Sequence, residues 1–141
     1  MKYFLIIIFS FALLSCSNKS ENNKNSDKTE FEMYNMSEMA ALMEQMYIDN
    51  ERLKQKIINA DSLGSFPEHF LKIHNAVMTD AEDNDAFFKE QAQLFLDAQH
   101  KIYENKKNTT ENYNKAIDAC INCHRVKCTG PIPKIKKLYI K

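Results

Sequence analysis

Apolar residues recur every three or four positions along most of the chain between residues 34 and 130, the spacing of one face of an α-helix. This pattern predicts four helices, at residues 36–60, 66–78, 85–103 and from 109 or 110 to 128. Glycine and proline are rare in this stretch, and no part of it alternates as a β-strand would. Because helices joined by short loops pack as antiparallel neighbours, the sequence predicts an all-α fold, an antiparallel four-helix bundle.

Local signals support the ends of two of these helices. Ser65 and Glu68 have the spacing of a capping box at the start of the second helix, where Pro67 lacks only an N–H that would be unpaired anyway. Gly130 and Pro131 are a pair that typically ends a helix, here the fourth. The predicted helical domain therefore covers residues 34–130.

The N-terminus carries the features of an export signal. Lys2 precedes an apolar run of about a dozen residues, whereas a membrane-spanning helix needs about twenty. The run ends in Leu-Leu-Ser-Cys at residues 13–16, which is similar to a bacterial lipobox. Residues 1–15 are therefore predicted to be a lipoprotein signal peptide, with lipid on Cys16 anchoring the mature chain to a membrane, most simply facing the periplasm. The alternative is an ordinary secretory signal with an incidental cysteine.

The segments on either side of the helical domain differ in character. Residues 17–30 contain no apolar side chain and cannot bury enough surface to fold, so residues 16–33 are predicted to be the lipidated cysteine and a flexible linker. Residues 131–141 form a basic C-terminal tail. The tail also contains apolar residues, which predict that it packs back onto the bundle: Ile132, Ile135, Leu138 and Ile140.

A C-x-x-C-H motif lies in the fourth predicted helix, at Cys120, Cys123 and His124. Two thiols one helical turn apart can each add to a vinyl group on the edge of one porphyrin, and the adjacent imidazole can then bind the iron. A zinc site would need ligands from a second part of the chain, and a thioredoxin-like dithiol would need a βαβ context. The motif therefore predicts one covalently attached haem c, held by Cys120 and Cys123, with His124 as the proximal iron ligand.

The other cysteines fit this interpretation. Of four in the chain, Cys16 is assigned to lipid and two belong to the motif, which leaves Cys128 without an obvious disulfide partner. Free cysteine is among the most buried residue types, so Cys128 is expected to be a small buried apolar residue. A redox-active thiol is the alternative.

A C-x-x-C-H motif on the last helix of a four-helix bundle resembles the class II cytochromes c, the cytochrome c-prime group. The resemblance covers the helical body and the residues Cys120, Cys123 and His124. It implies a haem near one end of the bundle, with a distal position that faces the first helix. Methionine occupies that position in electron-carrying members of the family, and an apolar residue that does not bind iron occupies it in gas-binding members.

The first predicted helix is rich in methionine, and a thioether is a suitable second axial ligand. At the usual helical rise, Met43 and His124 lie at about the same depth from their shared end of the bundle. Met43 is therefore the candidate distal ligand, with Met39 or Met46 as alternatives. Two other arrangements remain open. The distal position is vacant, or a second histidine binds the iron there, the candidates being His69, His74 and His100.

The net charge of zero conceals an uneven distribution of charge. Residues 31–124 contain sixteen acidic and nine basic side chains, whereas residues 125–141 contain six basic side chains and no acidic one. The basic segment is either a solvated tail or a docking surface for an acidic redox partner. The residues expected near such a partner are Arg125, Lys127, Lys134, Lys136 and Lys137.

Together these features predict a membrane-tethered electron carrier rather than an enzyme. The alternative is a gas-binding haem protein of the same family with an open distal site, which would take nitric oxide or carbon monoxide. An exported haem protein is an implausible nucleic-acid binder, and a homodimer is possible.

Overall fold

The structure is a computed structural model that describes residues 35–104 and 106–141. The expected signal peptide at 1–15 and the expected lipidated Cys16 with its linker at 16–33 lie outside the described residues. The predictions made for them therefore stay predictions.

Helix α2 (Glu38–Ile58) is the first long helix of the described chain. It begins at Ser37, whose hydroxyl oxygen accepts a hydrogen bond from the Ala40 amide at 3.1 Å. It ends in a Schellman motif, in which the amides of Ala60 and Asp61 donate to the carbonyls of Ile57 and Lys56. Ala60 occupies the left-handed position of this motif, with φ of 56°, where glycine is usual. The predicted helix at 36–60 is thus confirmed to within two residues at each end.

The second predicted helix, at 66–78, is wrong in kind and in length. The structure has η1 (Glu68–His74), a 3₁₀-helix of seven residues, which buries Phe70 and Ile73. A 3₁₀-helix has three residues per turn, so side chains three positions apart lie on the same side of it. The apolar spacing that suggested an α-helix therefore suits this shorter element too. Pro67 stands at its start without any side-chain cap, so the capping box expected from Ser65 does not form there.

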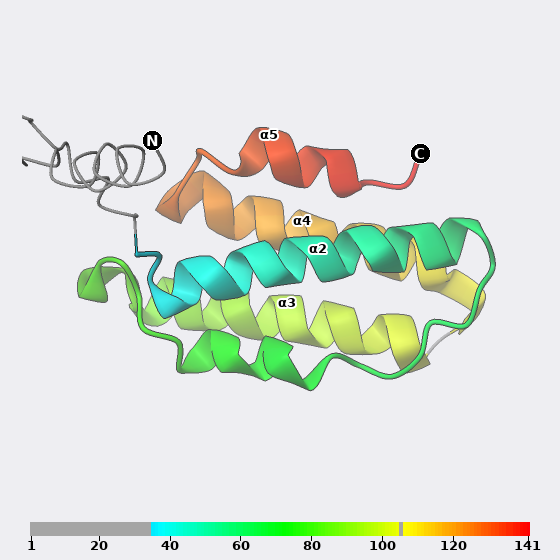
Figure 1. The fold of residues 1–141 in the computed structure, drawn as a ribbon, viewed down its shortest axis with the longest axis horizontal. Helices are drawn as coiled ribbons and strands as arrows, with labels where there is room; N and C mark the ends of the chain where they lie inside the picture. Colours follow the sequence, from blue (N-terminus) through cyan, green and yellow to red (C-terminus); the bar gives the residue numbers. More distant parts are fainter. Residues whose placement is uncertain (1–34, 105) are drawn as a thin grey trace, which may run out of the picture. The chain divides into compact units, whose positions relative to one another are not determined.

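Two further long helices follow. Helix α3 (Ala86–Glu104) comes after the short 3₁₀-helix η2 (Ala81–Asp83), and helix α4 (Thr109–Lys127) comes after η3 (Lys106–Asn108). Both α-helices agree closely with the predicted ranges. Figure 1 shows α2 and α3 running in the same direction, whereas α4 and η1, which comes between α2 and α3 in the sequence, run the opposite way. The directions therefore alternate along the chain as expected, although the second element is a short 3₁₀-helix.

The C-terminal segment is also folded. After a turn it forms α5 (Ile132–Ile135) and η4 (Lys136–Leu138), and both Ile135 and Leu138 are buried against α4 and its neighbours. The side chain of Asn114 on α4 donates to the Ile140 carbonyl and accepts from the Ile140 amide, which fixes the end of the segment. The expectation that the basic tail packs back onto the helices is confirmed.

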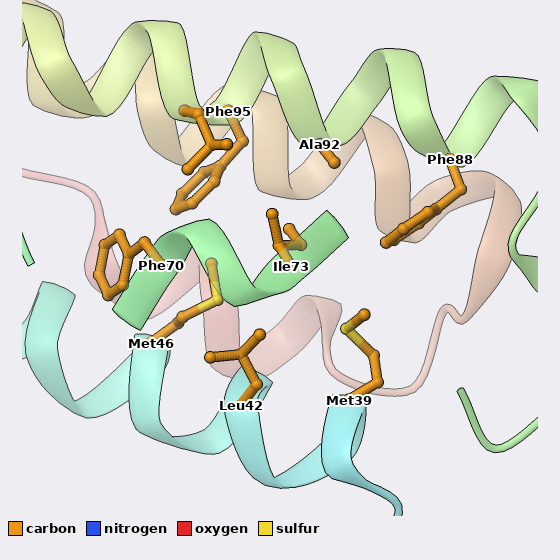
Figure 2. Close-up of a cluster of buried hydrophobic side chains, with 9 residues drawn as sticks. Met39, Leu42, Met46, Phe70, Ile73, Phe88, Ala92 and Phe95 are labelled. Carbon is orange, nitrogen blue, oxygen red and sulfur yellow. The ribbon is translucent and has the colours of Figure 1, made fainter. Parts of the chain in front are cut away.

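The interior consists of two groups of buried side chains. The first group joins α2, η1 and α3, and Figure 2 shows their side chains pointing toward one another. Its members are Met39, Leu42, Met46, Phe70, Ile73, Phe88, Ala92, Phe95 and Leu96. The second group joins α2, α3, α4 and the C-terminal segment around Tyr113 and Ile117. Cys120 packs against both groups, so the C-x-x-C-H motif lies where the two halves of the core meet.

The prediction of an all-α fold is confirmed for the described residues, which contain helices and no strand. Within the same part of the chain, none of the helices combines the length and apolar character needed to cross a membrane.

Candidate functional site

The C-x-x-C-H motif occupies the last two turns of α4, which ends at Lys127. Cys120 and His124 are four residues apart and therefore share one face of the helix. That face looks inward: His124 is buried at 8% exposure, and Cys120 is half-buried. Cys123 is half-buried too and packs against the first core group. The amphipathic pattern of α4 thus turns all three motif side chains toward the interior.

His124 is held by the turn that follows α4. Its Nδ1 lies 3.0 Å from the carbonyl oxygen of Cys128 and 3.2 Å from the sulfur of the same residue. A carbonyl oxygen can only accept a hydrogen bond, so Nδ1 carries the proton in this contact. Burial lowers the pKa of His124, and the hydrogen bond to the Cys128 carbonyl opposes that shift only in part. The imidazole is therefore neutral near pH 7, with its lone pair on Nε2.

This arrangement is the one that a metal-binding histidine needs. Histidines that bind metals usually donate the second ring N–H to a carbonyl or carboxylate, which fixes both the tautomer and the orientation of the ring. Nε2 of His124 has no hydrogen-bond partner among the described residues. It is therefore available as a ligand.

The motif thiols are protonated in the folded chain. Burial raises the pKa of Cys120 to about 12 and that of Cys123 to about 11. A thiolate is the nucleophile in disulfide exchange, so these raised pKa values disfavour that reaction at both thiols. Among the described residues, no group of three or more histidine, cysteine or acidic side chains is arranged to hold a metal ion.

A small cavity of about 70 Å³ lies beside the motif, bounded by α2, α3, α4 and the C-terminal segment. Cys120 and His124 line it from α4, and Met43 and Met46 line it from α2. Met43 and His124 therefore line the same cavity, while the role of Met43 as an iron ligand stays a prediction. Met39, the other alternative, does not line this cavity and lies in the first core group (Figure 2).

The donor atoms fit a covalent haem, whereas the cavity is too small to contain one. Ligand cavities usually measure about 300–1,000 Å³, several times the 70 Å³ available here. Side chains such as Tyr47, Phe95 and Ile135 form the walls of the cavity. These walls would have to separate to admit a macrocycle.

The three histidines considered as alternatives have other surroundings. Nε2 of His69 lies 2.8 Å from a carboxylate oxygen of Asp49, and the ring of His100 stacks on Phe66 with centroids 3.8 Å apart. Neither these two nor His74 lines the cavity beside His124. Two larger open hollows, of about 760 and 810 Å³, contain none of the motif residues.

The basic residues expected to meet a partner fall into two groups. Lys127 forms ion pairs with Asp83 and Asp85, at 3.4 and 2.7 Å, and Lys134 pairs with Glu44 on α2. Arg125, Lys136 and Lys137 are exposed instead. Of the five residues, these three form no ion pair with an acidic side chain among the described residues.

One feature of the site contradicts the sequence prediction, and another is absent from it. Cys128 is exposed rather than buried, because the chain leaves the helix there with an extended backbone. A buried polar cluster of Asn50, Gln99 and Tyr113 lies next to the cavity, which Asn50 lines. The sequence signal for that cluster was the polar Asn50 in the apolar series of the first helix.

Comparison with known proteins gives no match: the chain matches no protein-family model, no curated protein and no solved structure. The resemblance to the class II cytochromes c therefore rests on the motif and on the helical arrangement alone.

Proposed function

We propose that this chain is a membrane-tethered c-type cytochrome that carries single electrons through one covalently attached haem. The observation that carries the proposal is the geometry of His124, whose Nδ1 is fixed by the Cys128 carbonyl and whose Nε2 is free beside a cavity lined by Met43. A C-x-x-C-H motif that occurred by chance would not require the histidine to be buried, neutral and oriented.

Each residue has a distinct role in this proposal. Cys120 and Cys123 would form the thioether bonds, His124 would bind the iron through Nε2, and Met43 would supply a thioether from α2. When bound, the haem would supply a one-electron couple at its iron. The surrounding core groups would exclude water and hold the ligands on separate helices, α2 and α4, so that their positions change little between the two oxidation states.

The remaining parts of the proposal concern location and partners. Lipid on Cys16 would keep the domain at a bacterial membrane, facing the periplasm, within reach of membrane redox enzymes. The exposed Arg125, Lys136 and Lys137 would favour encounter with an acidic redox partner. The proposal requires no nucleic acid, and the protein could act as a monomer or as a homodimer.

The first test is whether the haem is covalent. The full-length chain would be produced in a bacterium that attaches haem c, purified in detergent and extracted with acidified acetone. The colour should stay with the polypeptide. It should be lost from the double variant Cys120→Ser/Cys123→Ser and kept in Cys128→Ser, the matched control. Colour that extracts from the wild type would contradict the proposal.

The second test separates electron transfer from gas binding. A protein with two protein ligands on iron should have a ferrous spectrum that carbon monoxide does not change. Met43→Ala should bind carbon monoxide, whereas Met39→Ala, which removes a buried methionine away from the cavity, should not. Carbon monoxide binding by the wild type would instead favour the gas-binding function. Refusal by Met43→Ala would point to Met46 as the ligand.

A further inference from the structure

The cavity beside His124 has walls from α2, α3, α4 and the C-terminal segment, and the three helices are fastened to one another beside it. Asn50 on α2 lines the cavity, and Gln99 on α3 and Tyr113 on α4 donate hydrogen bonds to it at 2.6 and 2.9 Å. All three of these residues are buried. Separating the helices here would leave buried polar groups without partners, which is costly. The helices are therefore the fixed walls of the cavity.

The C-terminal segment, residues 131–141, is held less firmly. It buries two apolar side chains, Ile135 and Leu138. Its ion pair between Lys134 and Glu44 lies at the surface, where the two side chains are 43% and 53% exposed, and such exposed pairs contribute little to stability. Elements with few buried contacts open at a lower cost than the core of a protein does. This segment is therefore the wall that can move with the smallest loss of interactions.

The turn between α4 and this segment allows such a movement. Residues 129–131 are all exposed, and a side-chain carbon added at Gly130 would meet nothing within 4 Å. Neighbouring atoms therefore do not obstruct a change of the backbone angles at this point, which is what a hinge requires. At the other end of the segment, Asn114 on α4 holds the backbone of Ile140 by two hydrogen bonds, which would have to break first.

We propose that residues 131–141 are a hinged lid on this cavity, which turns outward about residues 129–131 while α2, α3 and α4 stay together. The movement takes Ile135 and Leu138 out of the cavity wall and changes a space of about 70 Å³ into an open cleft between α2 and α4. The identity of the molecule that enters rests on the function proposed above, whereas the movement is a property of the chain by itself.

The three described cysteines distinguish this movement from unfolding. Cys120 lines the cavity and packs against the second core group, to which Ile135 and Leu138 belong. Cys123 packs against the first core group, which contains no residue of the lid. Opening of the lid should therefore uncover Cys120 but not Cys123, whereas unfolding of the helices would uncover both. Cys128 is exposed in either case and gives the unhindered rate of reaction.

The experiment measures how fast N-ethylmaleimide labels each of these thiols in the full-length, haem-free chain. In this reaction the S–H adds across the double bond of the reagent, with a new C–S bond and the proton on the neighbouring carbon. Mass spectrometry of tryptic peptides gives the three rates. Residues 116–125 hold both motif cysteines, which fragmentation separates, and Cys128 lies in a different peptide. In the wild type, Cys120 should react more slowly than Cys128.

The first variant loosens the far end of the lid. Asn114→Ala removes both hydrogen bonds to Ile140, and Asn114 does not line the cavity. Release of the lid is therefore the link between this position and Cys120. The variant should speed the labelling of Cys120 roughly 5- to 150-fold, the effect of losing two hydrogen bonds, and it should leave the rate of Cys123 unchanged.

The second variant loosens the middle of the lid. Lys134→Ala removes the ion pair with Glu44 and the ammonium group that lies 4.3 Å from the centre of the Tyr47 ring. The labelling of Cys120 should become roughly 3- to 30-fold faster. Lys136→Ala is the matched control, because Lys136 is an exposed lysine of the same segment. It should leave the labelling at the wild-type rate.

Three results would overturn the inference. One is a wild-type rate for Cys120 equal to that of Cys128, which would mean that the segment does not cover the site. Another is an unchanged rate for Cys120 in either loosened variant. The third is a rise in the rate of Cys123 that matches the rise at Cys120, which would mean that the helices unfold together. The extraction test for covalent haem does not depend on these rates, so failure of the lid and failure of the proposed function are separate results.

Discussion

Replacing Asn50 alone by leucine should destabilise the fold more than replacing Asn50 and Gln99 together. Asn50 on α2 is 2% exposed and Gln99 on α3 is fully buried. The Gln99 amide donates to the Asn50 side-chain oxygen at 2.6 Å, and the Asn50 amide donates to the Met46 carbonyl at 2.8 Å. Tyr113 on α4 donates to the backbone carbonyl of Asn50 at 2.9 Å. This polar cluster therefore joins the three long helices at one level.

The size of the effect follows from which groups lose their partners. Asn50→Leu leaves the whole side-chain amide of Gln99 buried without a partner, at a cost of about 1–3 kcal/mol. Gln99→Leu leaves the Asn50 side-chain oxygen without its donor, at a similar cost. The double variant removes both amides, including the Gln99 oxygen that already lacks a partner, and it keeps the Tyr113 bond to the backbone. Its stability should lie within about 1 kcal/mol of the wild type.

Urea unfolding followed by far-ultraviolet circular dichroism measures all four free energies. The coupling between the two positions is the summed loss of the two single variants less the loss of the double variant, and it should be about 1–6 kcal/mol in favour of the double variant. Gln93→Leu on the exposed face of α3 is the control, and it should change stability by less than about 0.5 kcal/mol. A double variant that loses the sum of the two single losses would refute the reasoning, because it would mean that neither amide depends on the other.

Two further outcomes are expected at the ends of helices. Ala60→Gly should raise the free energy of unfolding by about 0.5–1 kcal/mol, since glycine adopts the left-handed backbone at φ of 56° without strain; an unchanged melting temperature would contradict this. The hydrogen bond from Lys127 lowers the pKa of Asp85 below 3.8, with help from the Phe88 amide. As pH falls, the Asp85 carboxylate is therefore protonated in the unfolded chain before it is protonated in the folded chain. The stability that the Asp85 charge contributes is present above pH 3.8 and is lost as pH falls through the lowered pKa. Asp85→Asn can keep the bond to the Phe88 amide but not the charge, so the difference in stability between wild type and variant should shrink on acidification; a difference independent of pH would contradict the assignment.

The three long helices could be predicted from sequence because their apolar stripes are long. A stripe of five or six turns fits only one periodicity, and α2, α3 and α4 agree with the predicted ranges. The segment at 66–78 is shorter, and its central pair Phe70 and Ile73 satisfies a 3₁₀-helix as well as an α-helix. Val77, which the α-helical pattern would have buried, is 61% exposed.

The depth of a residue along its helix predicts its neighbours in the site, whereas residue type alone does not predict the burial of Cys128. The helical rise brought Met43 and His124 to the same level, and the two residues do line one cavity. Residue type predicts a buried Cys128, because free cysteines are usually buried, but Cys128 is exposed. Its position is set by the point at which α4 ends, and sequence patterns locate such ends only to within a few residues. The exposure of Cys128 and its contact with His124 both follow from that turn.

The basic C-terminal segment serves two different purposes along its length. One wall of the cavity beside His124 comes from this segment, so the segment is part of the site. The residues that form this wall are Pro131, Lys134, Ile135 and Leu138. Lys134 contributes through its pair with Glu44 and its position over the ring of Tyr47, which hold the segment against α2. Charge used in this way is neutralised and cannot attract a partner at a distance. The exposed lysines of η4, which pair with no acidic side chain in the described chain, carry the positive field beside the site. In the proposed function, anchoring the wall and attracting an acidic partner would thus fall to different, neighbouring lysines.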